Sequence, residues 1–219
     1  MVTAPMNGES VELFIRGAAG RLEATIRRCS ATRAAAIVCH SHPKYGGTML
    51  DKVVSRTARA LHACDFTVLR FNFRGVGKSD GAFEGGPGER DDVRAAIEYL
   101  AGDHDEILVG GFSFGAWVAL DVGARDARVT RLLGIGLPAN LFGFGYLGDA
   151  TKPLLVVQGE RDAYANLAHV RELVACAGIR AQLEVIVDAN HFFAGQLETL
   201  TMAVAAFASA GQSSCQVGG

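Results

Sequence analysis

The chain has 219 residues, of which 49% are hydrophobic and 20% are charged, a composition typical of a globular protein. Its 21 Lys and Arg residues nearly balance its 23 Asp and Glu residues, and the net charge of -2 gives no reason to expect a nucleic acid or an anionic membrane as a partner. The length fits one large domain, and no linker or internal repeat divides it.

The N-terminal stretch MVTAPMNGES has neither the basic nor the apolar region of a signal peptide. No apolar stretch is long enough to span a bilayer. The cysteines are odd in number and widely scattered, so we expect no disulfide framework and a reducing, cytoplasmic compartment. They are Cys29, Cys39, Cys64, Cys176 and Cys215.

The chain alternates between strand-like and helix-like segments. The first segment, VELFIRGAAGRLEATIRR, predicts an antiparallel hairpin that turns at Gly17–Gly20. Continuous apolar runs, typical of strands buried on both faces, follow at residues 34–39, 67–73, 106–112, 131–137, 153–159 and 183–188. Helical periodicity separates them at residues 49–64, 88–102, 117–125, 167–178 and 197–209.

This alternation predicts an α/β fold with right-handed crossovers. We expect a mostly parallel central sheet that is covered by helices on both faces and preceded by the antiparallel hairpin. Residues 1–209 would form one domain, and the small polar residues 210–219 would form a flexible tail.

Three glycines and a serine interrupt the apolar run LVGGFSFGAWVAL. Gly111-Phe112-Ser113-Phe114-Gly115 fits the G-x-S-x-G pattern of a sharp turn between a strand and a helix, which presents a strained serine to solvent. The outer glycines remove Cβ atoms that would collide where the strand and the helix cross. The helix N-terminus also directs its backbone dipoles at the serine. The pattern therefore predicts that Ser113 is a nucleophile.

A serine hydroxyl needs a base to accept its proton and an acid to orient that base. His191 follows the last predicted strand and Asp162 follows the strand before it. The carboxyl ends of parallel strands meet at one edge of a sheet, and chemistry is placed there. Either residue alone is ordinary in a loop, but the order Ser113, Asp162, His191 predicts a catalytic triad. Glu160 is the rival acid and ranks second, because it lies nearer the end of its strand.

An oxyanion hole needs two backbone N–H donors. We expect one from Phe114, the residue after the nucleophile, and the other from the loop HSHPKYGGTM. Pro43 has no N–H, so the second donor is His42, Lys44 or Tyr45, of which we favour His42.

Two other motifs could indicate ion binding. The run Cys39-His40-Ser41-His42 carries zinc-ligand residue types, but successive strand residues point to opposite faces and three of these four could not converge on one ion without distortion. We expect these histidines to anchor a tight loop, with no metal and no cofactor. FRGVGKSDG, residues 73–81, lacks the spacing of a phosphate-binding loop. It predicts a structured turn in which Arg74 pairs with a carboxylate or with carbonyl groups.

Together these residues resemble the α/β-hydrolase superfamily, from about Glu12 to Ser209. HSHPKYGGTMLDKVVSRTARAL, LRFNFRGVGKSDGAF and GGFSFGAWVA look like a group of small bacterial carboxylesterases of that fold, related to dienelactone-hydrolase-like enzymes. The resemblance implies that Ser113 is the nucleophile, His191 the base and Asp162 the acid. Ser41 departs from the family's pattern, which has proline in HPHP, and the departure concerns the second oxyanion donor.

Members of the superfamily often carry a helical cap between the strands predicted here at 131–137 and 153–159. The interval PANLFGFGYLGDATK has room for one short helix, so we expect no cap domain and an accessible serine. Four aromatic residues are candidates for the walls of a substrate pocket, although packing over the sheet end explains the last three equally well. They are Tyr45, Phe142, Phe144 and Tyr146.

The sequence therefore predicts a serine hydrolase that acts on small carboxylic esters through an acyl-enzyme. A small open site favours short acyl groups over long-chain lipids. We expect a small-molecule ester as the partner, and neither a nucleic acid nor a membrane. The alternatives are a thioesterase or small peptidase with the same residues, and a non-catalytic binding protein of the same fold. A complete triad argues against the last of these.

Overall fold

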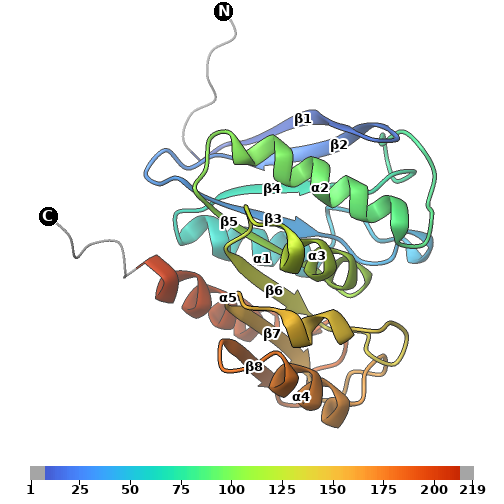
Figure 1. The fold of residues 1–219 in the computed structure, drawn as a ribbon, viewed down its shortest axis with the longest axis vertical. Helices are drawn as coiled ribbons and strands as arrows, with labels where there is room; N and C mark the ends of the chain where they lie inside the picture. Colours follow the sequence, from blue (N-terminus) through green and yellow to red (C-terminus); the bar gives the residue numbers. More distant parts are fainter. Residues whose placement is uncertain (1–7, 213–219) are drawn as a thin grey trace, which may run out of the picture.

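A computed structural model describes residues 8–212, and the apolar runs of the sequence form one eight-stranded sheet in it. In chain order the strands are β1 (Ser10–Gly17), β2 (Gly20–Arg27), β3 (Ala34–Cys39), β4 (Thr67–Phe71), β5 (Glu106–Phe112), β6 (Arg131–Ile135), β7 (Leu154–Gly159) and β8 (Ala181–Ile186). Their spatial order is β1-β2-β4-β3-β5-β6-β7-β8 (Figure 1). The six strands from β4 to β8 are parallel, and β2 pairs antiparallel with both β1 and β4. The predicted sheet and hairpin are confirmed.

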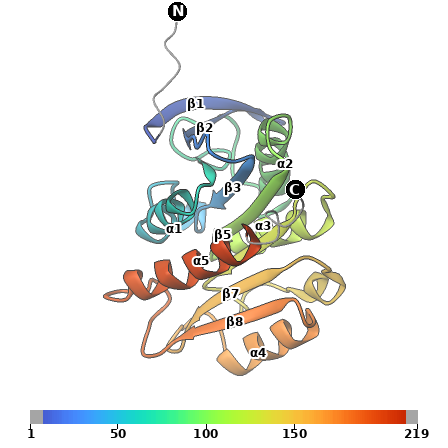
Figure 2. The ribbon, with the colours of Figure 1, turned by 90° about the vertical axis from the view of Figure 1, so that its left-hand side faces the viewer.

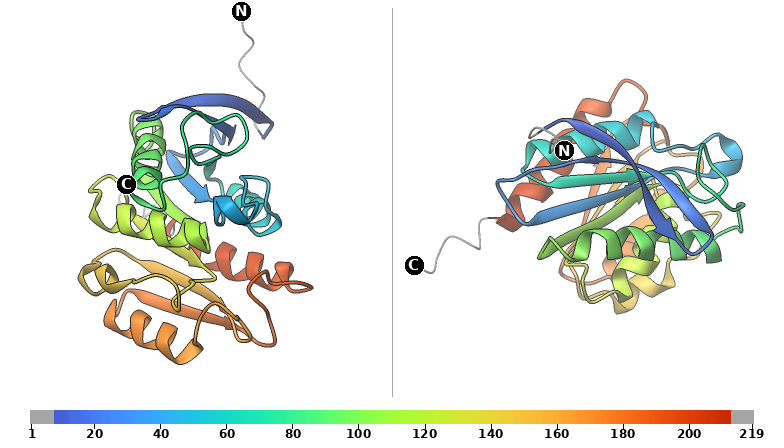
Figure 3. Two further views of the ribbon diagram at one scale, coloured as in Figure 1. Left: turned by 90° about the vertical axis from the view of Figure 1, so that its right-hand side faces the viewer. Right: turned by 90° about the horizontal axis from the view of Figure 1, so that it is seen from above.

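Helices cover both faces of the sheet. They are α1 (Lys52–Ala63), α2 (Pro87–Ala101), α3 (Phe114–Arg125), α4 (Leu167–Cys176) and α5 (Leu197–Gln212), with short 3-10 turns η1 (Pro43–Tyr45) and η2 (Gly145–Asp149). In Figure 2 and in the right-hand view of Figure 3, α1 and α5 lie on one side of the strands and α2 lies on the other. Each face of the sheet carries its own hydrophobic core, and alternate residues of β3 contribute to the two cores. Ala36 and Val38 pack towards α1 and α5, whereas Ile37 packs towards α2 and α3.

The predicted element boundaries differ from the structure at several ends. β4 and β6 each end two residues before the predicted limits of 73 and 137, where the chain leaves the sheet to form loops. β8 alternates between exposed and partly buried side chains, because it is an edge strand that pairs only with β7. α5 runs to Gln212, so the tail predicted from residue 210 starts inside the helix. Residues 213–219, which include Cys215, lie outside the described residues.

The interval between β6 and β7 contains only the single turn η2, so no cap domain is inserted there. This confirms the expectation from the length of the interval. Of the helices in residues 8–212, none combines the length and apolar character needed to cross a bilayer.

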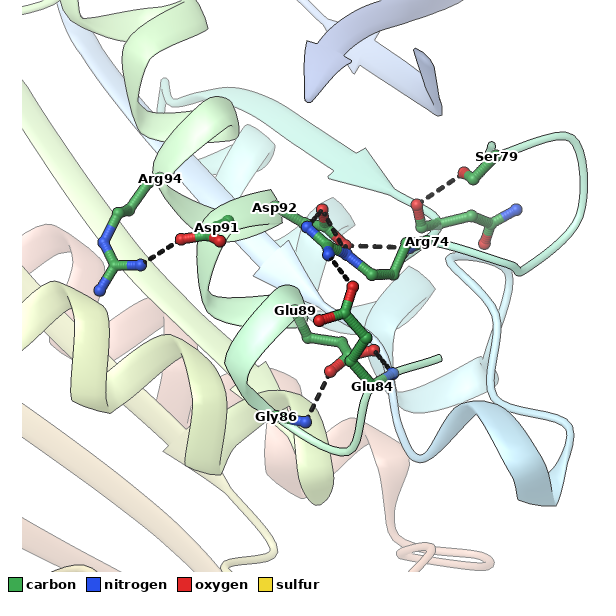
Figure 4. Close-up of polar contacts among 9 residues, drawn as sticks. Arg74, Ser79, Glu84, Gly86, Glu89, Asp91, Asp92 and Arg94 are labelled. Carbon is green, nitrogen blue, oxygen red and sulfur yellow. Dashed lines mark hydrogen bonds and ion pairs between the residues drawn. The ribbon is translucent and has the colours of Figure 1, made fainter. Parts of the chain in front are cut away.

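A buried ion pair holds the loop between β4 and α2 (Figure 4). Arg74 donates from Nη2 to Asp92 Oδ1 at 2.8 Å and from its backbone N to Asp92 Oδ2 at 2.9 Å, and it also pairs with Glu84. Buried Glu89 accepts hydrogen bonds from the backbone N–H groups of Glu84 (2.9 Å) and Gly86 (2.6 Å). Burial acts to lower the pKa of Arg74, but the hydrogen bonds and charges of Asp92 and Glu84 outweigh it and place this pKa above its usual value. The predicted pairing of Arg74 with a carboxylate is confirmed.

Removing the cation of this pair should destabilise the fold strongly, because it leaves the buried carboxylate of Asp92 without its positively charged partner. We expect Arg74→Met to lower the free energy of unfolding by about 3–5 kcal/mol in urea titrations. The matched control is Arg94→Met, because Arg94 pairs with Asp91 on the exposed side of α2, the helix that carries Asp92. Such exposed pairs contribute about 1 kcal/mol or less to the free energy of unfolding. Equal losses in the two variants would contradict this account of the loop.

Candidate active site

The structure brings Ser113, His191 and Asp162 together at the carboxyl ends of β5, β7 and β8. His191 Nε2 lies 3.0 Å from Ser113 Oγ, and His191 Nδ1 lies 2.8 Å from Asp162 Oδ2. A carboxylate only accepts hydrogen bonds, so the proton of the neutral ring resides on Nδ1. Nε2 is then the acceptor that faces the serine hydroxyl. This is the geometry that a base needs in order to withdraw the serine proton.

Ser113 occupies a tight turn between β5 and α3, and this turn requires glycine at positions 111 and 115. Its φ is 56° and its ψ is −122°, and α3 begins at the next residue. A Cβ on Gly111 would lie 2.5 Å from the carbonyl carbon of Gly115, and a Cβ on Gly115 would lie 2.3 Å from the carbonyl oxygen of His40. The two glycines therefore allow β5, α3 and the end of β3 to touch. The Ser113 N–H donates to Ile135 O at 2.9 Å, which helps to hold the turn.

Three donors and burial hold the carboxylate of Asp162 in place. Besides His191, it accepts from Gln158 Nε2 at 2.7 Å and from the Tyr164 N–H at 2.8 Å. Gln158 is itself fully buried, and its Oε1 accepts from the Leu137 N–H at 2.8 Å. Gln158 was not among the site residues predicted from the sequence. Its signal was a single polar side chain at the end of the otherwise apolar run PLLVVQG.

Glu160, the alternative acid, is engaged elsewhere. Its Oε2 accepts from the backbone N–H of Asp188 at 2.9 Å. That contact orders the turn after β8, and His191 Nδ1 donates its hydrogen bond to Asp162 instead.

Of the three backbone N–H groups considered for the second oxyanion donor, those of His42, Lys44 and Tyr45, two already donate within the loop after β3. The Lys44 N–H donates to His42 Nδ1 at 3.2 Å, and the Tyr45 N–H donates to His42 O at 3.0 Å. The His42 N–H has no acceptor within residues 8–212. Phe114 is the first residue of α3, so its N–H has no partner inside the helix. His42 and Phe114 border the same cavity as Ser113, and their roles as oxyanion donors remain a prediction.

His40 ties this loop to the backbone after β4, and Ser41 ties it to Asp51 at the start of α1. His40 is fully buried, accepts the Phe73 N–H at Nε2 (3.0 Å) and donates from Nδ1 to Ser41 O (2.7 Å). Burial lowers the pKa of His40 to about 4. Ser41, the departure from the family's proline, donates from Oγ to Asp51 Oδ2 at 2.6 Å. The polar groups of this run thus hold the loop, and within residues 8–212 no three His, Cys, Asp or Glu side chains are placed to hold a metal.

A cavity of about 100 Å³ opens beside Ser113. It is lined by Ser41, His42, Tyr45, Ser113, Phe114, Pro138, Leu141, Phe142, Tyr164, His191 and Phe192. Tyr45 and Phe142 thus lie in the wall of the cavity, as expected. Leu141, Tyr164 and Phe192 also line it and were not predicted from the sequence. The expectation for Phe144 and Tyr146 is wrong.

Phe144 and Tyr146 pack into the core instead, because η2 folds back onto α3. Phe144 is only 2% exposed. Tyr146 donates its hydroxyl to Trp117 O at 2.9 Å, and burial raises its pKa. Of the predicted aromatic trio, only Phe142 faces the cavity, where its ring stacks on Trp117 at a centroid distance of 4.4 Å.

Comparisons with known proteins identify the family and the fold of this chain. Residues 33–214 match the model of a family described as an alpha/beta hydrolase domain. The chain is similar to the crystal structure of XC6422 from Xanthomonas campestris, an a/b serine hydrolase without lid, with a TM-score of 0.84, 34% identity and coverage of 93% of this chain and 94% of that one. It is also 33% identical over 205 residues to RP471 of Rickettsia prowazekii, covering 88% and 86% of the two chains. A shorter match, 42% identical over 82 residues, spans 36% of this chain and 25% of the human mitochondrial palmitoyl-protein thioesterase ABHD10.

The burial of His40 predicts a specific pH dependence of stability. Its pKa is about 4 in the fold against an ordinary value of 6.5, so the unfolded chain binds the proton first as the pH falls. The stabilisation is complete above about pH 6.5 and is lost as the pH falls to about 4, by up to about 3 kcal/mol. His40→Gln keeps an acceptor for the Phe73 N–H but does not titrate. Urea unfolding of both proteins between these pH values should show a smaller loss for the variant, and equal losses would contradict the assignment.

Proposed function

Because this chain belongs to the alpha/beta hydrolase domain family, we propose that it is a serine hydrolase that cleaves short-chain carboxylic esters. The proposal rests above all on the hydrogen-bonded series Asp162, His191 and Ser113 at the N-terminus of α3. The site is accessible, since no cap domain is inserted between β6 and β7. The serine at the strained turn excludes the carboxylate-nucleophile chemistry of dehalogenases and epoxide hydrolases of this fold.

Acylation begins when Ser113 Oγ attacks the carbonyl carbon of the ester while its proton moves to His191 Nε2. The negative charge that develops on the carbonyl oxygen is stabilised by the N–H groups of Phe114 and His42 and by the positive end of α3. When the tetrahedral intermediate collapses, the ester C–O bond breaks and His191 donates its proton to the departing alcohol. The acyl group remains on Ser113.

Deacylation repeats these steps with water. His191 Nε2 accepts a proton from water as the water oxygen attacks the acyl-serine carbonyl, and it returns that proton to Ser113 Oγ as the acid leaves. Asp162 stays ionised and keeps the ring proton on Nδ1. Gln158 and the Tyr164 N–H prevent the carboxylate from turning away from the histidine.

The size of the cavity supports a short acyl group. About 100 Å³ is available beside Ser113, and the aromatic rings of Phe142, Tyr164 and Phe192 border it. A larger hollow of about 430 Å³ adjoins it and shares Ser41, Tyr45 and Phe192 as lining residues. We assign the smaller space to the acyl group and the larger one to the alcohol portion of the ester.

A long-chain acyl thioesterase is the second candidate. The 430 Å³ hollow has apolar side chains from Val53, Phe112 and Leu197, and a long acyl chain could enter it past Tyr45 and Phe192. The short match to a palmitoyl-protein thioesterase favours the same substrate class. Acyl-chain selectivity distinguishes the two candidates.

The triad assignment predicts how three variants hydrolyse p-nitrophenyl butyrate. Ser113→Ala should abolish turnover. Asp162→Asn should lower kcat by about 10⁴-fold, because an amide no longer holds the required tautomer of His191. Glu160→Gln is the matched control and should keep wild-type kcat, since Glu160 contacts Asp188 and not the histidine. Loss of activity in Glu160→Gln with retention in Asp162→Asn would reverse the assignment of the acid.

Labelling with a fluorophosphonate separates a wrong substrate from an inactive site. The wild type should form an adduct at Ser113 that is detectable by mass spectrometry, and Ser113→Ala should form none. Labelling without turnover of any ester would retain the serine chemistry and reject the ester class. The absence of both would favour the non-catalytic binding protein.

Acyl-chain selectivity should depend on Tyr45. For wild type, kcat/KM for p-nitrophenyl acetate or butyrate should exceed that for the palmitate ester at least about tenfold, because the acyl space is small. Tyr45→Ala should narrow this ratio by joining the two hollows. Tyr99→Ala, a change at a tyrosine outside both hollows, should leave the ratio unchanged. A wild-type preference for palmitate, or for palmitoyl thioesters, would favour the second candidate.

A further inference from the structure

A separate cavity of about 270 Å³ lies between the middle of α1 and the edge of the sheet. None of its lining residues borders the hollows at Ser113. Strand alternation explains its polar floor. Leu22, Ala24 and Ile26 of β2 face the core on the α2 side, so the intervening side chains of β2 face α1.

Three arginines line this cavity, Arg27 of β2, Arg59 of α1 and Arg70 of β4. In the described part of the chain, none of them forms an ion pair with a carboxylate, whereas Arg74 and Arg90 are paired with Asp residues. Within residues 8–212, Arg27 and Arg70 hydrogen-bond only to neutral groups. Arg27 Nε donates to Gly8 O at 2.6 Å, and Arg70 Nη1 donates to Met49 O at 3.0 Å and to Ser55 Oγ at 2.9 Å.

The cations also affect each other. Burial, and then the charge of Arg59, lower the pKa of Arg70. Glu12 faces the same side of the sheet, because it is paired in register with Thr25, but it is exposed and makes no ion pair with these arginines within residues 8–212. Residues 1–7, which precede Gly8, contain no Asp or Glu. Within residues 8–212, no carboxylate therefore forms an ion pair with the three arginines of the cavity.

The floor of the cavity holds a hydroxyl group without a partner. Thr25 is 8% exposed, and its Oγ1 has no hydrogen-bond partner within residues 8–212. It lies between two of the cations, since Thr25 pairs in register with Arg70 and Arg27 is the next residue of β2 on the same face. Buried hydroxyls normally find a partner, so this unpaired group is an exception in the lining of the cavity.

We propose that this cavity binds the phosphate group of a phosphorylated small molecule. A phosphate dianion offsets two of the three positive charges, and planar guanidinium N–H donors fit phosphate oxygens in pairs. Thr25 and Ser55 add hydroxyl groups at the same place. The volume of about 270 Å³ leaves room for an organic portion beside the phosphate.

The test is calorimetric titration of the whole protein with inorganic phosphate at pH 8 and constant ionic strength. We expect saturable binding at one site. Arg59→Gln should raise the Kd about tenfold, because it removes a charge-assisted hydrogen bond to the ligand from a side chain that makes no hydrogen bond within residues 8–212. Arg56→Gln is the matched control, since Arg56 lies on the same helix outside the cavity, and its Kd should stay within about twofold of wild type.

Thr25→Val tests the buried hydroxyl, because it keeps the shape of the side chain and removes only its polar atom. We expect a Kd raised several-fold, with the thermal stability of the ligand-free protein retained or increased. Absence of saturable binding, or equal weakening in Arg56→Gln and Arg59→Gln, would overturn the proposal. Acetate that competes as well as phosphate would also overturn it, in favour of a carboxylate ligand.

Discussion

The contact between β5, α3 and the end of β3 is the constraint on which the site depends. At Gly111 and Gly115 the three backbones approach so closely that any Cβ would overlap a neighbouring main-chain atom. This contact forces the chain to reverse direction within one residue, and that residue is Ser113 with its positive φ. The hydroxyl group is thereby held at the N-terminus of a helix whose first N–H groups are free, so the same turn supplies both the proposed nucleophile and part of its electrostatic environment.

Buried polar contacts position the other loops around that turn. Asp162 is oriented by Gln158, which is tied in turn to the backbone after β6. His40 ties the loop after β3 to the backbone after β4. Buried polar contacts of this kind stabilise the fold only when every polar group is paired. Removing one partner destabilises the fold by more than the intact pair stabilises it. The precision of the site thus depends on side chains that do not touch the substrate.

The loop held by Arg74 also reaches the site. Its residue Phe83 contacts both His42 and Phe114, with ring centroids 5.0 Å and 5.7 Å apart. The two proposed oxyanion donors therefore share an aromatic neighbour whose position depends on the buried pair of Arg74 and Asp92. Packing between aromatic rings of this kind restrains the backbone that carries them.

The amino-acid sequence alone sufficed for features that depend on local chemistry or on chain order. Continuous apolar runs identified the buried strands, the glycines around Ser113 identified the turn, and the order of Asp162 and His191 placed both at one edge of a parallel sheet. Side-chain direction could not be obtained in this way. Phe142 and Phe144 are two residues apart and chemically identical, yet one faces the cavity and the other the core, because the fold of η2 decides it. Likewise Arg27, Arg59 and Arg70 are ordinary surface cations in sequence, and only strand register and the placement of α1 bring them into one cavity.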